Sequence, residues 1–372
     1  MQYNDIRGCL QEIFSHNLQS NVTYIPRVYS NLAREHGMEE GLAPIKNGVE
    51  RKYLEALNTK NIDHCLKILG QWAKISCDGD GVKSNNKIGT YDVGTKLLNK
   101  IATALHNKPV SDFLKNLSIE REVFTRAGGD EFDFLLGRFD GIEEVCFYEI
   151  TPTILTQGTI LDLFSELIVS EVTNTPFPEL DFHSPYAQEK LGPYGRTLLQ
   201  KAEQHSGEKF YFTPSVAIGS CTLLEGFISY LNDGADLTLP IAELAKKLMG
   251  KVEDLCAKRV ETTKVQTKKI LWLSDDPGQK MQAYMTIRGD SDKEFAIFKD
   301  ESRRLTKIQG CLIRASKEVN ACFREYAKNS ASTPILNELE AIILRLENLI
   351  DLNLEEREDL EDIKKEFEIN ID

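Results

Sequence analysis

The stretch Arg126-Ala127-Gly128-Gly129-Asp130-Glu131-Phe132 joins two glycines directly to two carboxylates. Strand-forming residues flank it, namely Glu122 to Thr125 on one side and Phe132 to Leu136 on the other. Because glycine adopts positive φ without steric cost, this pattern predicts a tight β-hairpin turn with Asp130 and Glu131 at its tip. Two adjacent carboxylates favour a divalent cation between them, and the missing glycine side chains leave room for a ligand near the backbone. The alternative is a structural Gly-Gly-Asp turn, which is common.

The bulk composition is that of a globular protein with a sizeable core. The chain has 372 residues, of which 41% are hydrophobic and 28% charged, and this length suits about two domains of ~150 residues each. The formal net charge of -13 argues against broad, sequence-independent binding of nucleic acid, which requires a basic surface. A local basic pocket for a nucleotide is compatible with this charge.

Cysteine spacing and hydropathy bear on the cellular compartment. The eight cysteines are scattered, with no Cys-x-x-Cys pair and no Cys/His cluster, which argues against a zinc site. Unpaired thiols are typical of the reducing cytosol. No secretory signal is visible at the N-terminus, and no apolar run approaches the ~20 residues that span a bilayer. We therefore expect a cytoplasmic protein without a membrane span.

A second acidic tip precedes the first. The strand candidate Trp72 to Cys77 ends in Asp78-Gly79-Asp80-Gly81, and a polar, glycine-punctuated loop then leads into an amphipathic helix starting near Val93. A calcium loop of the EF-hand type is rejected, because its twelfth position holds Gly89 instead of a bidentate Glu. Two acidic tips on neighbouring strands are what a two-metal phosphoryl-transfer site requires.

Three separated motifs carry a resemblance. They are Gly128 to Phe132, then Asp78 to Lys87 with Gly94 to Leu98 behind it, and Phe212 to Gly219. In this order they resemble the GGDEF (diguanylate cyclase) family. The second motif has the spacing of the family's Asp-x-Asp-x-Phe-Lys-x-x-Asn-Asp pattern and of its following helix start, without a gap from Asp78 to Gly94. The third is similar to the family's Val-Thr-x-Ser-x-Gly strand, with one residue inserted.

This resemblance covers about residues 48 to 262 and implies both a fold and a reaction. The fold would be α+β and palm-like (ferredoxin-like or adenylate-cyclase-like), with a central, largely antiparallel sheet flanked by helices. The reaction would condense two GTP to cyclic di-GMP across a homodimer, with Mg²⁺ or Mn²⁺ as cofactor. It needs no nucleic acid and no membrane.

The resemblance also implies roles for individual residues, position by position. Asp78, the Gly79 carbonyl and Glu131 would be metal ligands. Asp130 would assist the metal or accept the proton of the attacking 3′-hydroxyl. Asn86 would recognise the guanine edge and Lys83 would contact the triphosphate. These residue types suit the chemistry, because hard oxygen ligands bind Mg²⁺, an amide pairs with a base and an ammonium pairs with phosphate.

Other positions depart from the family pattern. Thr95 stands where the family has an Asp that partners the Asn in guanine recognition, which forfeits a charge-assisted hydrogen bond worth ~1.5–3 kcal/mol. Lys87 and Val82 also differ from the family's residues, and its C-terminal phosphate clamp is not recognisable. The best substitutes for the clamp are Lys247 and Lys251, which lie one helical turn apart. The alternative is that the two lysines only form a solvated helix face.

Two main hypotheses follow from this mixture. The chain is either an active, Mg²⁺-dependent diguanylate cyclase or a catalytically degenerate domain that acts as a nucleotide-binding or protein-interaction module. A third hypothesis is a different nucleotidyl-transfer product, because Thr95 loosens guanine specificity.

The remaining segments predict the domain organisation. Residues 1–47 form an N-terminal helical extension, 48–273 the cyclase-like domain with an inserted lid or partner loop at about 176–209, and 279–372 a mostly helical C-terminal region. Within it we expect a short strand from Met281 to Ile287, a helix begun by Ser332-Thr333-Pro334 and an acidic helix from Glu355 to Phe367.

This C-terminal hairpin would pack on the body of the protein, or else serve dimerisation or a protein partner. Its Glu-rich end resembles translocation signals of some bacterial effectors, so a secreted effector is the alternative to a cytoplasmic protein.

Overall fold

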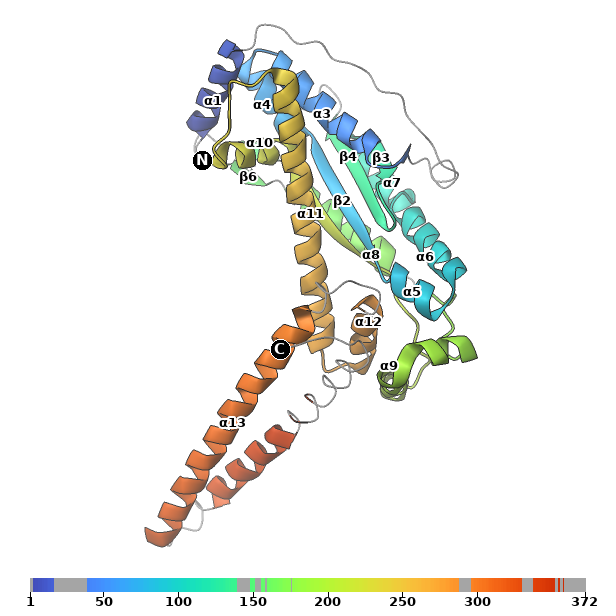
Figure 1. The fold of residues 1–372 in the computed structure, drawn as a ribbon, viewed down its shortest axis with the longest axis vertical. Coiled ribbons are helices and arrows are strands. Elements are labelled where there is room, and N and C mark those ends of the chain that lie inside the picture. Colours follow the sequence, from blue (N-terminus) through green and yellow to red (C-terminus); the bar gives the residue numbers. More distant parts are fainter. Residues whose placement is uncertain are drawn as a thin grey trace. The chain divides into compact units, whose positions relative to one another are not determined.

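The computed structural model describes residues 3–16, 39–138, 148–150, 155–157, 159–174, 176–287, 296–329, 337–351, 354 and 357. These residues form an α+β protein, which confirms the predicted fold class at that level (Figure 1). The chain divides into two compact units, one of residues 1–181 and 211–267 and the other of residues 182–210 and 268–372. The predicted domain boundaries stay a prediction beside this division.

A five-stranded sheet in the order β1-β3-β4-β2-β7 lies at the centre of the first unit. The five strands are β1 (Glu39–Glu40), β2 (Ala73–Asp80), β3 (Ile119–Arg126), β4 (Glu131–Arg138) and β7 (Ser215–Thr222). Strands β3, β4, β2 and β7 pair antiparallel, whereas β1 runs parallel to β3. A separate hairpin joins β5 (Tyr148–Ile150) and β6 (Leu155–Gln157).

Alternation of side chains gives the sheet two buried faces. On β3 and β4, Val123 opposes Leu135 on one face and Phe124 opposes Phe134 on the other. The first pair belongs to a large hydrophobic core that also includes Trp72 and Cys221. The Phe124 and Phe134 rings stack with centroids 4.4 Å apart, and Phe134 meets Phe164 edge-on. Both faces are therefore covered by helices.

The helices on the Val123 face are α1 (Tyr3–His16), α3 (Ala43–Asn58), α4 (Ile62–Gln71), α10 (Leu223–Asn232) and the first part of α11 (Ile241–Leu273). Their apolar stripes supply most of that core, for example Tyr53 and Phe227, which are fully buried. The other face carries α6 (Tyr91–Ala104), α7 (Lys108–Asn116) and α8 (Thr159–Thr173). The short helix α5 (Val82–Ile88) connects β2 to α6.

The turn at Gly128-Gly129 differs from the predicted tight turn. Neither glycine has positive φ, so the chain does not need glycine there for its backbone conformation. Instead Ala127 N–H donates to the Glu131 carbonyl (2.9 Å), and the Arg126 guanidinium donates twice to the Gly129 carbonyl (2.6 and 3.1 Å). The turn is therefore wider than predicted. Its backbone hydrogen bond joins residues four positions apart, and the Arg126 side chain supplies the other two hydrogen bonds.

Two other sequence-based predictions are wrong. The segment Met281 to Ile287 lies in helix α12 (Pro277–Ile287) and not in a strand. The predicted insertion contains a long helix, α9 (Pro185–Ser206), kinked at Gly192, where a loop was expected. The reason is mutual packing: Tyr284 of α12 is fully buried against α9 and donates its hydroxyl to the Leu191 carbonyl (2.5 Å). A short run of apolar residues does not reveal such packing.

The C-terminal part of the second unit consists of α13 (Ala296–Asn329) and a helix over residues 337–351. The helix predicted around Leu339 and Leu346 is confirmed there. Its predicted start at Ser332-Thr333-Pro334 lies outside the described residues. The predicted acidic helix from Glu355 to Phe367 does so as well, apart from Arg357.

Candidate functional site

The two acidic motifs meet at one end of the central sheet. In the antiparallel pairing of β2 and β4, Asp78 stands directly opposite Glu131. Residues opposite each other in such a pair point to the same face, with Cβ atoms ~5 Å apart. Two like charges in that position destabilise the sheet unless a cation compensates them. The sequence prediction that these two motifs lie together is therefore confirmed, although β2 extends past Asp78 to Asp80.

Backbone contacts fix Asp130 beside the same strand. Gly79 N–H donates to the Asp130 carbonyl at 2.9 Å. A side chain at Gly79 would have its Cβ 2.8 Å from Ile101 Cδ1 of α6 and 3.9 Å from Asp130 Cβ, so the glycine permits this close approach. Asp78, Gly79, Asp130 and Glu131 are thus brought together, as predicted.

Gly128 has a steric role at this site. A Cβ placed on Gly128 would lie 2.5 Å from the Glu131 carboxylate oxygen Oε2, so the Glu131 side chain folds back over the glycine. No atom lies within 4 Å of a Cβ placed on Gly129. Gly128 therefore makes room for a carboxylate, while the space beside Gly129 is open.

Helix α11 supplies a lysine that sequence reasoning missed. The helix packs closely on β7, where a Cβ on Gly219 would lie 2.8 Å from the Val260 nitrogen, and Thr263 Oγ1 donates to the Ile218 carbonyl (3.2 Å). One residue later, Lys264 Nζ lies 2.9 Å from Asp78 Oδ2. Both side chains are largely buried, with 18% and 16% of their surface exposed. No local motif marks Lys264, because only the packing of α11 on the sheet brings it to Asp78.

The Asp78 side chain has a pKa close to neutral pH. Burial raises its pKa, and the neighbouring Asp130 and Asp80 raise it further, while Lys264 opposes them, which leaves the pKa at about 7. Only one carboxylate oxygen contacts Lys264. The other, Oδ1, is buried and has no hydrogen-bond partner among the described residues. A buried carboxylate oxygen without a partner is costly and marks a place where a ligand would be stabilising.

The turn between β2 and α6 contains further oxygens without partners. The side-chain oxygens of Ser84, Asn85 and Asn86 are all buried, and none has a hydrogen-bond partner among the described residues. Asn86 Oδ1 packs against Gly94, which has no space for a Cβ. This places Asn86 beside the start of α6, the predicted location of guanine recognition.

No family model, no curated protein and no solved structure matches the chain. Membership of the GGDEF family therefore stays a prediction that rests on the quoted motifs.

The other predicted nucleotide contacts lie in different places. Lys83 is exposed on the first turn of α5, and Thr95 is exposed on α6, where its hydroxyl donates to the Tyr91 carbonyl (3.0 Å). Lys251 pairs instead with Asp233 (2.6 Å). It precedes Lys264 by 13 residues, which is about 20 Å along the helix. Lys247, one turn earlier, lies near Asp236. The structure thus does not bring Lys247 and Lys251 to the carboxylates.

The donor set matches the chemistry of Mg²⁺ but is not arranged as a closed metal site. Asp78, Asp130 and Glu131 offer hard carboxylate oxygens, and no described residue hydrogen-bonds to Asp78 Oδ1. However, no group of three or more His, Cys, Asp or Glu side chains is placed to hold a metal ion within the described part of the chain. The residues present therefore fit the ion by type, and Glu131 would have to turn from Gly128 toward Asp78.

A buried ion pair lies on the same face of the sheet, further from the tip. Lys74 Nζ is 3.4 Å from Asp133 Oδ2, and both side chains are almost fully buried. Burial lowers the pKa of Lys74, but the nearby Asp133, Cys256 and Glu253 outweigh it, so the pKa is raised and the lysine stays charged. This pair belongs to the core beneath the candidate site.

Among the helices of the described segments, none combines the length and the apolar character that crossing a membrane requires.

Proposed function

We propose that the chain is a diguanylate cyclase, which binds GTP with Mg²⁺ or Mn²⁺ at Asp78, Asp130 and Glu131 and condenses two GTP to cyclic di-GMP. The observation that carries this proposal is the cross-strand pair of Asp78 and Glu131, with the Asp78 oxygen Oδ1 left without a partner beside it. Acids at the ends of adjacent strands provide the negative charge that a triphosphate-bound cation needs. The antiparallel sheet between two helical layers supports the finer proposal of a palm-like cyclase fold.

Each residue in this proposal has a distinct task. Asp78 and Glu131, with the Gly79 carbonyl, would hold the cation, which neutralises the triphosphate when bound. Asp130 would accept the proton of the attacking 3′-hydroxyl, Lys83 would contact phosphate, and Lys264 adds a second ammonium close to Asp78.

Guanine binding in this proposal falls to Asn86 and Thr95, beside Gly94. The open space beside Gly129 would receive the nucleotide, and Gly128 would do so once the Glu131 side chain turns away from it. Joining two GTP requires two such sites to face each other, so the active species would be a homodimer.

The test is incubation of the purified full chain with GTP and Mg²⁺ or Mn²⁺, followed by detection of cyclic di-GMP. We expect product from the wild type and a loss of at least about a hundredfold in Glu131→Gln, because it removes a cation ligand and a charge. The matched control is Glu189→Gln, which changes a carboxylate that is 73% exposed on α9 and should keep full activity. Absence of product from the wild type, or equal product from Glu131→Gln, would refute the proposal.

A second candidate function is a nucleotide-binding or protein-interaction module without catalysis. The observation that favours it is the Lys264–Asp78 ion pair, because an ammonium already compensates the carboxylate that would ligate the cation. Calorimetry with a non-hydrolysable GTP analogue would separate the two. A catalytically degenerate module binds the analogue equally well with EDTA or with Mg²⁺ and forms no product, whereas the cyclase requires the cation. Comparing GTP with ATP in both assays tests the looser base specificity that Thr95 suggests.

A further inference from the structure

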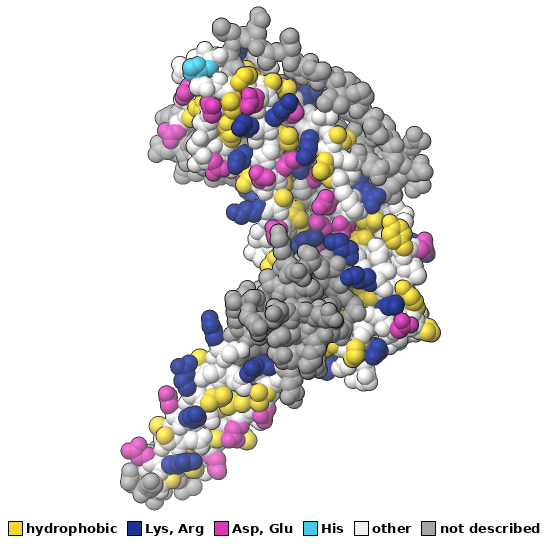
Figure 2. Space-filling view, viewed as in Figure 1, with side chains coloured by type: hydrophobic (Ala, Val, Ile, Leu, Met, Phe, Trp, Pro, Cys, Tyr) yellow, Lys and Arg dark blue, Asp and Glu magenta, His cyan; other side chains and the backbone are white. Residues whose placement is uncertain are grey.

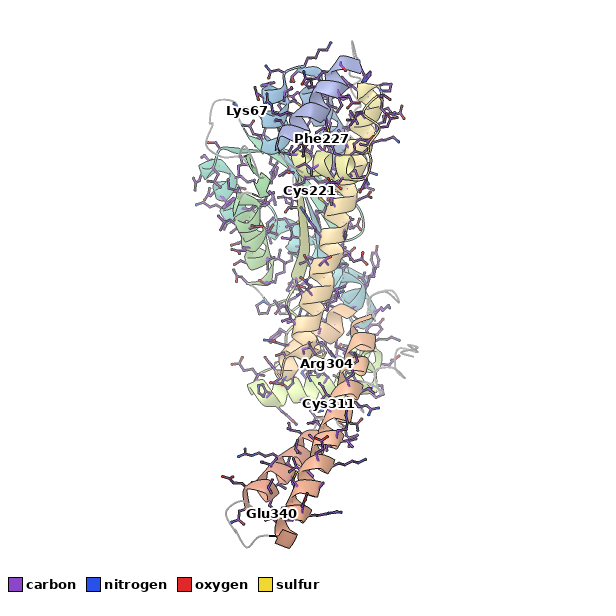
Figure 3. All side chains as sticks on the ribbon, turned by 90° about the vertical axis from the view of Figure 1, so that its left-hand side faces the viewer. Lys67, Cys221, Phe227, Arg304, Cys311 and Glu340 are labelled. Atoms are coloured by element: carbon purple, nitrogen blue, oxygen red, sulfur yellow. The ribbon has the colours of Figure 1, made fainter. Side chains whose placement is uncertain are left out.

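The C-terminal helices form a pair with no enclosed core of its own. Helix α13 and the helix over residues 337–351 run side by side in opposite directions, as two views show (Figures 1 and 3). The side chains of Arg357 and Gln309 hydrogen-bond across the pair. None of the residues after Thr286 whose side chains the structure describes is buried, although the rest of the described chain holds an extensive core. The better covered apolar residues of the two helices are only partly buried, for example Val319, Phe323 and Leu346.

Large apolar side chains are also exposed on the outside of this pair. They are Ile313, Ile342, Leu344, Leu349 and Leu354, with exposed fractions from 38% to 60%. Ile342 and Leu349 are seven residues apart, which places them on one stripe of the helix. Two helices alone bury too little apolar surface to be stable in water, and contiguous exposed apolar surface marks an interaction site. A four-helix bundle is the simplest structure that covers such a stripe.

The charges of the pair indicate what covers it. Helix α13 carries eight Lys or Arg against four Asp or Glu, a net charge of +4. The helix over residues 337–351 carries four Asp or Glu against one Arg, a net charge of -3. Figure 2 shows apolar side chains exposed along this pair, among basic and acidic ones. In two copies related by a twofold axis, the basic helix of each copy can therefore face the acidic helix of the other.

We propose that this helical hairpin, residues 296–351, binds the hairpin of a second copy of the chain to form an antiparallel four-helix bundle. A twofold axis would place the basic α13 of each copy against the acidic helix of the other. Ile342 and Leu349 would enter the shared core, and charged residues such as Arg314 and Glu347 would meet at its rim. An anionic membrane surface fits less well, because the acidic helix would repel it. The inference is independent of the proposed function.

Sedimentation equilibrium of the full chain tests the inference directly. We expect a species of twice the 42.1 kDa chain mass for the wild type. The double variant Ile342→Glu, Leu349→Glu should be monomeric, with the dissociation constant of the dimer raised at least about a hundredfold, because two unpaired carboxylates would have to be buried. The far-ultraviolet circular dichroism of this variant should be that of the wild type, since both positions are exposed within one copy.

The matched control replaces exposed apolar residues outside the hairpin. Leu163→Glu, Ile270→Glu changes positions that are 51% and 69% exposed and should leave the dimer intact. A monomeric wild type would overturn the inference, and so would a dimer that survives Ile342→Glu, Leu349→Glu.

A charge exchange distinguishes the proposed pairing from any other dimer. One variant carries Arg314→Glu and Lys317→Glu on α13, and the other carries Glu340→Lys and Glu347→Lys on the acidic helix; all four positions are exposed. Each variant alone should dimerise more weakly than the wild type, because like charges face each other. An equimolar mixture should form a heterodimer of restored affinity. If the variants in the mixture associate no more tightly than each variant does alone, the pairing of α13 with the acidic helix is contradicted.

Discussion

Asp78 shows how burial and neighbouring charges set the chemistry of a single carboxyl group. Burial and the carboxylates of Asp130 and Asp80 favour its protonated form, whereas Lys264 favours the ionised form. The balance leaves the pKa at about 7, against 3.8 for an unperturbed Asp. Asp78 therefore changes charge near neutral pH, where a bound cation would compete with its proton.

This raised pKa predicts a pH-dependent stability. Between about pH 4 and 7 the folded state holds a proton that the unfolded state has released, so the free energy of unfolding falls as pH rises, by at most ~1.4 kcal/mol per pH unit from this group. Asp78→Asn removes the effect. The measurement is urea unfolding with EDTA present. The free energy of unfolding of the variant, relative to that of the wild type, should rise from pH 4 to 7 and stay constant above pH 7.

The control for this prediction is Asp92→Asn, which changes a carboxylate that is 72% exposed on α6. Its stability should run parallel to that of the wild type across the same pH range. A parallel curve for Asp78→Asn as well would show that Asp78 does not titrate as inferred.

Two glycines of the acidic motifs should respond very differently to substitution by alanine. Gly81 has φ +81°, and an added Cβ would clash with the Phe212 ring, so Gly81→Ala should lower the free energy of unfolding by about 2–4 kcal/mol. Gly129→Ala meets no atom within 4 Å and should change it by less than about 0.5 kcal/mol. Chemical denaturation of both variants checks this. Equal losses would contradict the roles assigned to the two glycines.

At the scale of elements, the junction of β7 and α10 positions α11 and hence Lys264. Thr222 and Glu225 form a reciprocal capping box, in which each side chain accepts a hydrogen bond from the other's backbone N–H (3.1 and 3.0 Å). The Glu225 carboxylate also pairs with Arg259 of α11 at 2.7 Å. The cap therefore joins a strand, a helix start and the helix that carries Lys264.

We expect Thr222→Ala to lower the free energy of unfolding by about 1–2 kcal/mol, because it leaves a helix N–H without its acceptor. Thr222→Ser keeps the hydroxyl and should recover most of that loss. Thermal denaturation measures both. A serine variant as unstable as the alanine variant would show that methyl packing, and not the cap, determines the effect.

The elements also show where sequence patterns were sufficient. The strands that end in the two acidic tips follow from their local residue patterns, and both are present as β2 and β4. Helices α9 and α12 did not follow. The seven residues Met281 to Ile287 are too few to distinguish the helical from the strand period, and the Gly and Pro residues of α9 are turn signals. Contact between the two helices, through Tyr284, selects the helical form.

At the scale of the whole molecule, the chain combines a sheet-based unit that carries the carboxylates with a unit that ends in the exposed helical hairpin. The two proposals concern different units and are tested by different measurements. A cyclase assay reports on Asp78 and Glu131, and sedimentation reports on Ile342 and Leu349. Loss of the dimer together with loss of product formation would link the two.

The sequence by itself determined the two acidic tips, because each depends on a short-range pattern. The α+β class and the proximity of Asp78, Gly79, Asp130 and Glu131 followed from the resemblance of the motifs, since the β2–β4 pairing that joins them is long-range. Only the tertiary structure decided which lysine reaches Asp78. Lys264 lies 186 residues away in the chain, and its position depends on how α11 packs against β7, which no local pattern encodes. The same holds for Gly128, which gives space to the Glu131 carboxylate instead of a special backbone angle.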